Sequence, residues 1–239
     1  MKDGTNYVKQ YDIKHKIQRL YVHWDVSTQC NFKCTYCYAM KDYGDEWGKI
    51  DDWKKQQLVI KNLGRARLPV FLGLLGGEPT IHPHYPELIE KCLEVVKKHP
   101  DGRLYVTTNG STKNTIFENH QYDDRLYFLF SFHSEYEFKY KKGFEILLKN
   151  IDIAVNRGFK VKVNVMLHYK QKMWEKTHKF VDKLEKYGDR INIHPHFLYA
   201  EGDVHKLQDY SIDFYKEFER FKDYPDYFTF EDSNGNKKI

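Results

Sequence analysis

Three cysteines lie close together near the start of the chain, at positions Cys30, Cys34 and Cys37. Cube-type iron–sulfur clusters usually take four cysteine thiolates from the protein. Three thiolates on one short loop can surround such a cube and leave one iron without a protein ligand. Because an open coordination position is where a metal site performs chemistry, the C-x3-C-x2-C spacing predicts a reactive iron–sulfur cluster.

A structural zinc site and a disulfide are two other possible uses of these cysteines. A structural zinc ion takes four ligands, commonly as two separated pairs. The remaining cysteine, Cys92, stands alone in the sequence. Disulfide frameworks are typical of short secreted chains that are dense in cysteine, and this chain has 4 cysteines in 239 residues. The sequence therefore favours the cluster.

Three segments around and beyond the triad carry a family resemblance. They are Tyr36 in the aromatic position before the last cysteine, Gly76-Gly77-Glu78-Pro79 after an apolar run, and Thr108-Asn109-Gly110 after another. In this order and with these separations they resemble the signature of the radical S-adenosylmethionine (radical SAM) enzymes. The resemblance extends from roughly Arg19 to Tyr199. The cysteine loop resembles that of the SPASM or twitch peptide-modifying group, but no cysteine follows Cys92, so auxiliary-cluster cysteines are absent from the sequence given.

The resemblance implies a cofactor pair and a reaction. Cys30, Cys34 and Cys37 would hold an oxygen-sensitive [4Fe–4S] cluster, and SAM would chelate the unique iron. The reduced cluster would cleave SAM to a 5′-deoxyadenosyl radical, and this radical would remove a hydrogen atom from the substrate. An electron donor such as flavodoxin or ferredoxin would supply the electron.

The resemblance also suggests which residues contact SAM. The two glycines would let the backbone approach SAM, Glu78 would accept from its amino group, and Tyr36 would lie beside the adenine. Ser131 or His133 would contact the carboxylate or ribose, and Asn164 the ribose. Many peptide-modifying relatives have Ser-x-Asp where this chain has Ser131-Phe132-His133, which leaves the ribose contact open. The full predicted set is Tyr36, Gly76, Gly77, Glu78, Pro79, Asn109, Ser131, His133, Asn164 and Leu198.

Strand-like and helix-like segments alternate along the chain and would position these residues. The expected strands are Leu20–Ser27, Val70–Leu75, Arg103–Thr108, Leu126–His133, Phe159–Leu167 and Arg190–Leu198. The expected helices are Asp51–Ala66, Tyr85–His99, Thr112–Asn119, Gly143–Asn156, Gln171–Tyr187 and Ser211–Phe221. Alternation of this kind implies parallel strands with right-handed crossovers. It predicts an α/β fold, a partial (β/α)6 TIM-like barrel, because a full barrel needs about 250 residues.

The chain is expected to form one core domain with two short additions. Residues 1–18 would be an N-terminal extension and residues 19–223 the radical SAM core. Residues 224–239 would be a tail, either a short hairpin around the Asn234-Gly235 turn or the truncated start of a further domain.

Strand alternation predicts a polar inner face for the barrel. The residues expected to point inward include His23, His133, His194 and His196, whereas an inner face with only a structural role is filled by Val, Ile and Leu. The prediction is a substrate pocket that includes His133, His194 and His196. Two alternatives remain: the polar groups bond one another, or His194 and His196 bind a second metal.

The composition indicates which classes of partner to expect. Net charge is +5, from 39 basic and 34 acidic residues, and no dense basic run indicates a nucleic-acid groove. No stretch resembles a signal peptide or a membrane span, so a cytoplasmic location is expected.

Three substrate hypotheses are compatible with the sequence. The first is a peptide or protein side chain, although 29 residues before Cys30 are too few for a separate leader-binding domain. The second is a small molecule, such as a nucleotide, sugar or cofactor precursor, which the compact size and inward histidines favour; an activator of glycyl-radical enzymes is a weaker variant. The third is a non-catalytic module that binds the cluster and SAM.

Overall fold

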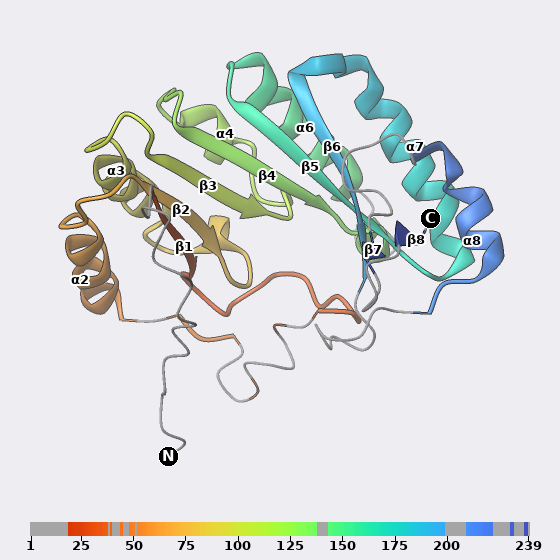
Figure 1. Ribbon diagram of the computed structural model, residues 1–239, viewed down its shortest axis with the longest axis horizontal. Helices are drawn as coiled ribbons and strands as arrows, with labels where there is room; N and C mark the ends of the chain where they lie inside the picture. Colours follow the sequence, from red (N-terminus) through yellow and green to blue (C-terminus); the bar gives the residue numbers. More distant parts are fainter. Residues whose placement is uncertain are drawn as a thin grey trace.

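The computed structural model describes residues 19–37, 39, 44, 48–50, 52–137, 143–198, 209–221, 230–231 and 237–238. Within these ranges six strands form one sheet in the order β1-β2-β3-β4-β5-β6 (Figure 1). Every neighbouring pair is parallel, so all six carboxyl ends meet at one edge. The strands are β1 Leu20–Asp25, β2 Val70–Leu75, β3 Arg103–Thr108, β4 Leu126–Phe132, β5 Lys160–Leu167 and β6 Ile191–Phe197.

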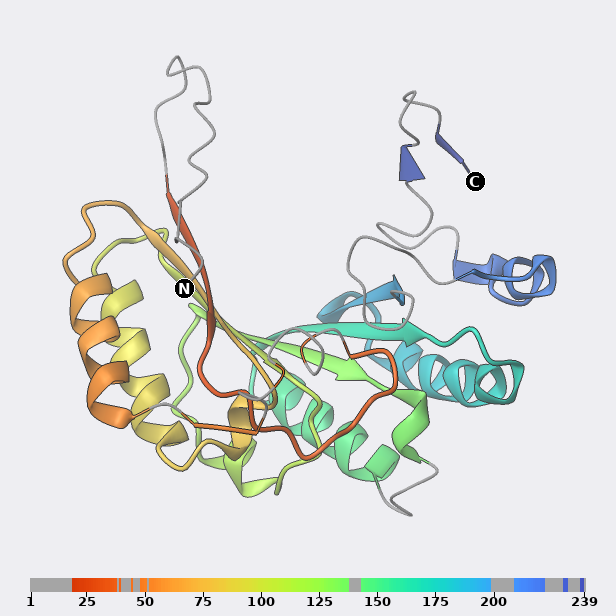
Figure 2. The same ribbon diagram turned by 90° about the horizontal axis from the view of Figure 1, so that it is seen from below.

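The sheet is curved and open, because β1 and β6 end the strand order without pairing with each other. The helices between the strands lie on its convex side (Figure 2). They are α2 Trp53–Leu63, α3 Tyr85–Val96, α4 Thr115–Asn119, α6 Gly143–Asn156 and α7 Trp174–Leu184. Short elements complete the framework: η2 Pro79–Ile81, α5 Ser134–Glu137, η3 Gln171–Met173, η4 Glu185–Arg190, α8 Ile212–Glu217 and η6 Glu219–Phe221. The predicted α/β partial barrel with parallel strands is confirmed.

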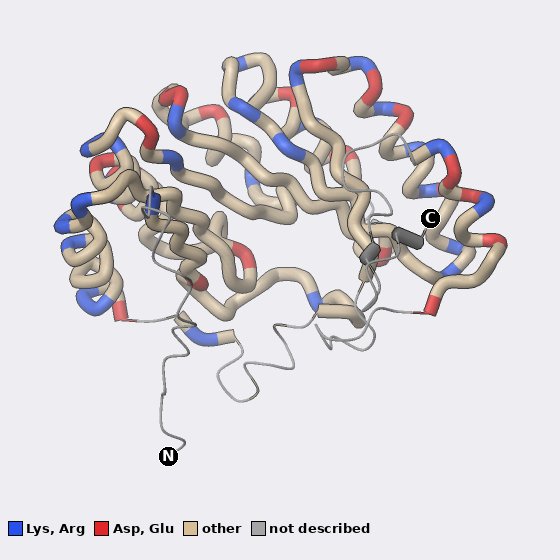
Figure 3. The backbone as a smooth tube through the Cα atoms, viewed as in Figure 1, with Lys and Arg blue, Asp and Glu red and all other residues tan. Residues whose placement is uncertain are grey.

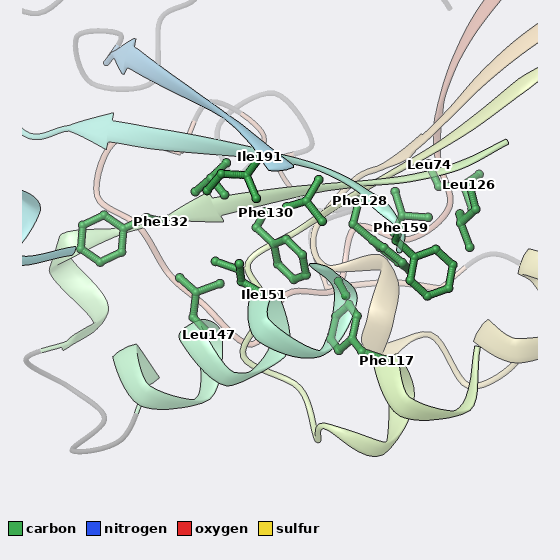
Figure 4. Packing of buried hydrophobic residues seen from close by; sticks show 14 of the residues in the cluster. Leu74, Phe117, Leu126, Phe128, Phe130, Phe132, Leu147, Ile151, Phe159 and Ile191 are labelled. Carbon is green, nitrogen blue, oxygen red and sulfur yellow. The ribbon is translucent and has the colours of Figure 1, made fainter. Parts of the chain in front are cut away.

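The core lies between the convex face of the sheet and these helices. Phe128 and Phe130 point from β4 toward Phe117 and Ile151 (Figure 4), and all four are fully buried. Full burial of a large apolar side chain contributes about 1.5–3 kcal/mol, so this layer fixes the direction in which each strand faces. Cys92 is also fully buried in this core, as its place on the apolar side of α3 predicts.

Strand alternation sends the other set of side chains to the concave face. On β5 the odd-numbered residues from Val161 to Leu167 are buried, whereas Lys162, Asn164 and Met166 are partly exposed. On β6 His194 and His196 are likewise partly exposed. The concave face is therefore open and polar at these strands, and the predicted assignment of inward and outward residues is correct for them.

Side-chain caps and glycine conformations explain where several helices begin and end. Asp52 caps α2 through its side chain, which accepts from the backbone N–H of Lys54 at 2.7 Å. Gly158, two residues beyond the end of α6, adopts a positive φ of 84°, which a glycine allows at little cost. The predicted helix over 171–187 is divided into η3, α7 and η4, and η4 extends to Arg190 with non-helical backbone at Gly188.

The tail contains a small antiparallel pair, β7 Phe230–Glu231 with β8 Lys237–Lys238. This pairing agrees with the predicted hairpin, whose turn lies outside the described residues. The N-terminal extension 1–18 also lies outside them, and the domain boundaries stay predictions. No helix in the described part of the chain is both long and apolar enough to span a bilayer.

Candidate functional site

A cavity of about 200 Å³ opens at the carboxyl ends of the strands and continues into about 1000 Å³ of space free of protein atoms. All three clustered cysteines line it, together with the ends of β2, β3, β4 and β6. The segment after β1 reaches this place by running past the carboxyl ends of the neighbouring strands (Figure 1). The predicted site residues that line the cavity are Cys30, Cys34, Cys37, Tyr36, Gly76, Gly77, Glu78, Asn109, Ser131, His133, His196 and Leu198.

The glycine turn after β2 holds the start of the cysteine loop. Gly77 N–H donates to the Ser27 carbonyl at 2.7 Å, and Glu78 N–H donates to the Gln29 carbonyl at 2.8 Å. A Cβ atom on Gly76 or Gly77 would lie 2.1 Å from one of these carbonyl oxygens. The glycines are therefore required for close approach of the chain to itself. From the sequence alone, the expected role of these glycines is approach of the backbone to SAM.

The carboxylate of Glu78 is used inside the protein. Its side chain is 1% exposed. Oε1 accepts from the Thr108 hydroxyl at 2.7 Å and from Thr80, and Oε2 accepts from the backbone N–H of Asn109 at 2.6 Å. Burial raises the pKa of Glu78, while these hydrogen bonds act in the opposite direction. This carboxylate joins the glycine turn to the end of β3; contact with an amino group of SAM stays a prediction.

An amide network continues this connection to the cysteine loop. Asn109 donates from Nδ2 to Oδ1 of Asn31 at 2.9 Å, and Asn31 donates from its own Nδ2 to the Ser111 hydroxyl at 2.7 Å. The Ser111 hydroxyl donates back to Asn109 at 2.6 Å. The three side chains therefore attach the residue after Cys30 to the end of β3.

A second carboxylate holds the loop from the other side. Glu135 of α5 accepts from the Thr35 backbone N–H at 2.9 Å and from the Thr35 hydroxyl at 2.6 Å. Nδ1 of His168 accepts from the backbone N–H of Lys170, so its proton is on Nε2, which donates to Glu135 at 3.0 Å. Burial raises the pKa of Glu135, but the hydrogen bonds from His168 and Thr35 outweigh burial and lower it to about 2.

Aromatic rings pack the loop against the same side. Phe32 stacks on Tyr136 of α5, with ring centroids 3.8 Å apart and an interplanar angle of 6°. Tyr36 is 9% exposed, and its hydroxyl lies 2.8 Å from Nδ1 of His133. The same Nδ1 lies 3.5 Å from Sγ of Cys34. His133, predicted as a ribose or substrate contact, therefore touches the cysteine loop directly, and burial lowers its pKa to about 4.

The cysteines are placed where a cationic group is needed to ionise them. Burial raises the pKa of Cys30 to about 12 and that of Cys34 further still, so both are neutral thiols without a metal. Metal binding requires thiolates, and iron supplies the positive charge that stabilises them. Among the residues that the structure describes, no group of three or more His, Cys, Asp or Glu could hold a single metal ion. Three thiols that line one cavity are a donor set of the type that iron–sulfur clusters use.

Three predicted residues do not line the cavity. Pro79 is buried as the first residue of η2, where it shapes the turn after Glu78. Asn164 and His194 are cross-strand neighbours on the concave face. Each lies two residues before the residue of its own strand that lines the cavity, Met166 or His196. Their roles stay predictions.

Sequence reasoning also missed several residues of the site. The residues that hold the loop, all outside the predicted set, are Asn31, Phe32, Thr35, Thr108, Ser111, Glu135, Tyr136 and His168. A signal existed for Glu135, since it is a carboxylate only three residues beyond β4, a strand that ends at the site. Nothing in the sequence indicates that its partner is Thr35.

Comparison with known proteins places this site in a family. Residues 24–181, well over half of the chain, match the family described as Radical SAM superfamily. An S-adenosylmethionine-dependent nucleotide dehydratase of Fibrobacter sp. (strain UWH6) is 30% identical over 104 residues, which are 40% of this chain and 28% of that protein. A GTP 3′,8-cyclase of Staphylococcus epidermidis is 28% identical over 161 residues, 59% of this chain and 44% of that protein. The chain thus spans less than half the length of these relatives.

Solved structures share the fold. Streptococcus suis SuiB bound to the precursor peptide SuiA has a TM-score of 0.51 at 19% identity, over 74% of this chain and 39% of that one. Native anSMEcpe with bound AdoMet and the Cp18Cys peptide has a TM-score of 0.54 at 18% identity, over 84% and 57%. At such identities the likeness concerns the fold.

Proposed function

The chain belongs to the radical SAM superfamily, and on that premise we propose that it is an enzyme that uses a [4Fe–4S] cluster to cleave SAM reductively and remove a hydrogen atom from a substrate. The superfamily uses this cluster and SAM, so the cofactors follow from membership. The assignment of ligands and contacts within this chain is the proposal.

One observation carries the proposal. Cys30, Cys34 and Cys37 line the same cavity as the Gly76-Gly77 turn and the carboxyl ends of β3 and β4. In parallel α/β sheets, ligands bind beyond the carboxyl ends of the strands. The three thiols are therefore at the place where a cluster and a second ligand can meet.

The chain's own residues have defined tasks in this scheme. The cysteines would bind the cluster. The backbone N–H of Glu78 and the carboxylate of Glu135 hold the cysteine loop from opposite sides, through their bonds to Gln29 and Thr35. Phe32, Tyr36 and Leu198 are at most 9% exposed and reduce the access of water to the cysteines. When bound, the reduced cluster and SAM supply a 5′-deoxyadenosyl radical, which is the hydrogen-abstracting species.

The polar groups around the cavity support a second ligand. Ser131 is 5% exposed and lines the cavity, yet its hydroxyl makes no hydrogen bond with any residue in the described part of the chain. A hydroxyl that lines the cavity can donate to a bound ligand, so Ser131 fits a contact to the SAM carboxylate or ribose. The backbone of Gly76 and Gly77 and the side chain of Asn109 complete the lining on the β2–β3 side.

The substrate would lie on the open concave face below the cavity. A peptide or protein side chain is the first candidate from the sequence, and the titles of two structural neighbours name bound peptides. A small molecule is the second, and the names of two sequence relatives include nucleotide substrates. A donor such as flavodoxin or ferredoxin and a cytoplasmic location remain predictions.

The experiment is anaerobic reconstitution with iron and sulfide, followed by SAM and dithionite. We expect 5′-deoxyadenosine from the wild-type protein and none from Cys34→Ala. Cys92→Ala is the matched control, because Cys92 lies in the core away from the cavity, and it should retain cleavage. A loaded cluster with bound SAM but no 5′-deoxyadenosine would support the non-catalytic module instead, and undiminished cleavage by Cys34→Ala would refute the ligand assignment.

A further inference from the structure

The sulfur atoms of Cys30 and Cys34 have different hydrogen-bond partners. Sγ of Cys30 accepts from the backbone N–H of Phe32 at 3.3 Å. Sγ of Cys34 lies beside two side chains, with Nδ1 of His133 at 3.5 Å and the hydroxyl of Tyr36 as a further hydrogen-bond partner. The surroundings of the Cys34 sulfur therefore depend on side-chain groups that a substitution can remove.

Tyr36 and His133 also contact each other. The Tyr36 hydroxyl lies 2.8 Å from Nδ1 of His133, and the two rings are nearly parallel, with centroids 6.0 Å apart. The Tyr36 ring meets the ring of His168 edge-on, with centroids 5.6 Å apart. Packing against two imidazoles therefore holds the Tyr36 hydroxyl beside the sulfur of Cys34. Tyr36 and His133 are called here the Tyr36–His133 pair.

The acceptors decide where the protons of this pair lie. A cysteine that binds a metal is a thiolate, which can only accept hydrogen bonds. If Nδ1 of His133 carried no proton, two acceptors, Nδ1 and the Cys34 sulfur, would face each other at 3.5 Å. With the proton on Nδ1, His133 donates to the Tyr36 oxygen, and the Tyr36 hydroxyl donates to the sulfur. This arrangement gives each of the three atoms a compatible partner.

The cysteine loop itself carries little charge. Lys33 is the one charged residue from Val26 to Cys37, and Figure 3 shows the segment after β1 largely without charge, in contrast to the outer helices. Burial raises the pKa of Cys34, and the neighbouring cysteines and Glu135 add to this effect, while the hydrogen bond from Tyr36 lowers the pKa. Tyr36 is therefore a group that stabilises negative charge on this sulfur.

We propose that Tyr36, oriented by His133, donates a hydrogen bond to the thiolate of Cys34 and thereby raises the reduction potential of the bound cluster. Both are positioning residues, because neither binds iron. This inference rests on the proposed function, since it concerns the cluster that the three cysteines would hold in that same site.

A donor at this sulfur favours the reduced cluster for an electrostatic reason. Reduction adds one electron from an external reductant to [4Fe–4S]²⁺ and gives [4Fe–4S]⁺, and no proton moves. Hydrogen bonds to the sulfurs help to set the potential of such clusters, and a bond to a more negative acceptor is stronger.

Burial strengthens this effect. Cys34 is 8% exposed and Tyr36 is 9% exposed, so little water competes for the sulfur or screens its charge. Donors that do not bind the metal also tune it in other metal sites, where they orient the ligands and change their basicity. Loss of the Tyr36 hydroxyl should therefore make the cluster harder to reduce.

The test measures the midpoint potential of the reconstituted protein without SAM, by titration with dithionite and redox mediators followed by electron paramagnetic resonance. We expect Tyr36→Phe to lower the equilibrium constant for reduction at least about threefold, which is about 28 mV for a one-electron couple. His133→Phe should shift the potential in the same direction, because Tyr36 loses the group that orients it. His133→Asn, whose amide N–H can replace the Nδ1 donor, should restore at least about half of the potential lost in His133→Phe.

Tyr85→Phe is the matched control. Tyr85 is also a buried tyrosine beside a histidine, since its hydroxyl lies 3.2 Å from Nε2 of His120, but it belongs to α3 and the core. The potential of this variant should equal that of the wild type. Iron and sulfide content and thermal unfolding of each variant show which proteins hold a complete cluster, and potentials are compared among those.

Three results would overturn the role of the Tyr36–His133 pair. They are an unchanged potential in Tyr36→Phe, an equal shift in Tyr85→Phe, or equal shifts in His133→Phe and His133→Asn. If Tyr36→Phe takes up no cluster, the two His133 variants decide. Formation of 5′-deoxyadenosine by the wild type is measured separately, so unchanged potentials with intact SAM cleavage refute the role of the pair alone, whereas absence of SAM cleavage refutes the proposed function.

Discussion

The cysteine loop is held from two sides, and the two sides use different chemistry. On the β2–β3 side the closest contacts are between backbones, with glycines that permit carbonyl oxygens to approach, and the Asn31 network adds neutral side-chain hydrogen bonds. On the β4–β5 side one carboxylate, that of Glu135, accepts from the backbone N–H and hydroxyl of Thr35 and from His168. The first side tolerates almost no added atom, whereas the second depends on a charge. Substitutions and pH should therefore separate them.

The largest expected effect is that of Gly77→Ala. The new Cβ would lie 2.1 Å from the Gln29 carbonyl oxygen, a backbone atom that cannot rotate away. We expect a loss of at least about 3 kcal/mol of folding stability, at the upper end for overpacked sites, and failure to incorporate iron. Urea unfolding and iron content measure the two effects.

Gly73→Ala on β2 is the matched control. Its Cβ would have side-chain atoms of Leu75 and His23 as its two nearest contacts, at 3.1 and 3.3 Å, and the Val22 carbonyl oxygen at an ordinary 3.7 Å. A loss below about 1 kcal/mol is expected. Equal losses in the two variants would show that the turn is not a special point of contact.

Glu135→Ala should produce the next largest effect. It leaves the buried N–H of His168 and the donors of Thr35 without their acceptor, at about 1–3 kcal/mol for the unpaired groups. Iron incorporation should decline but not vanish, because the glycine side is unchanged. Wild-type stability and iron content in this variant would show that the Glu135 contacts on the β4–β5 side do not hold the cysteine loop.

The two carboxylates should give pH dependences of opposite sign. The pKa of Glu135 falls from 4.5 to about 2 in the folded protein, so its stabilisation is complete above about pH 4.5 and is lost as pH falls toward 2. With allowance for solvent screening this amounts to about 1–2 kcal/mol. The pKa of Glu78 is raised, so its ionisation opposes folding and stability declines as pH rises through its folded pKa.

Urea unfolding of the metal-free protein across this pH range measures both effects. Glu135→Gln should flatten the acid limb alone, and Glu78→Gln should flatten the decline on the alkaline side of pH 4.5 alone. If both variants alter the same limb, the two carboxylates do not differ as described.

The smallest effect is expected for Asn31→Ala. It removes one hydrogen bond to Asn109 and one to Ser111 on an exposed part of the loop. Hydrogen bonds of this kind contribute about 0.5–1.5 kcal/mol each, and water can replace them. A loss of about 1 kcal/mol is expected by urea unfolding; a loss equal to that of Gly77→Ala would contradict the ranking.

The same two sides show how far the sequence determines the site. The cysteine spacing and Gly76-Gly77 were recognisable because they are local and make demands on geometry that few residues meet. Strand alternation likewise assigned Phe128, Phe130 and the residues of β5 to the correct faces. These features depend on neighbours within a few positions of the chain.

The other side could not be predicted in that way. Thr35 and Glu135 are 100 positions apart, and their contact follows from the path of the loop rather than from any pattern. His133 was assigned to a ligand, but its Nδ1 lies 2.8 Å from the Tyr36 hydroxyl. The same holds for Glu78 on the β2–β3 side: the sequence assigns it to SAM, and its oxygens accept from the chain itself. Side-chain partners of this kind are decided by tertiary packing.

The most direct test of the account is electron paramagnetic resonance of the reduced, reconstituted protein with and without SAM. If the three cysteines leave one iron open, the wild-type spectrum should be that of a [4Fe–4S]⁺ cluster and should change when SAM is added. An unchanged spectrum with SAM present, or a protein that binds only one metal ion per chain, would contradict the account.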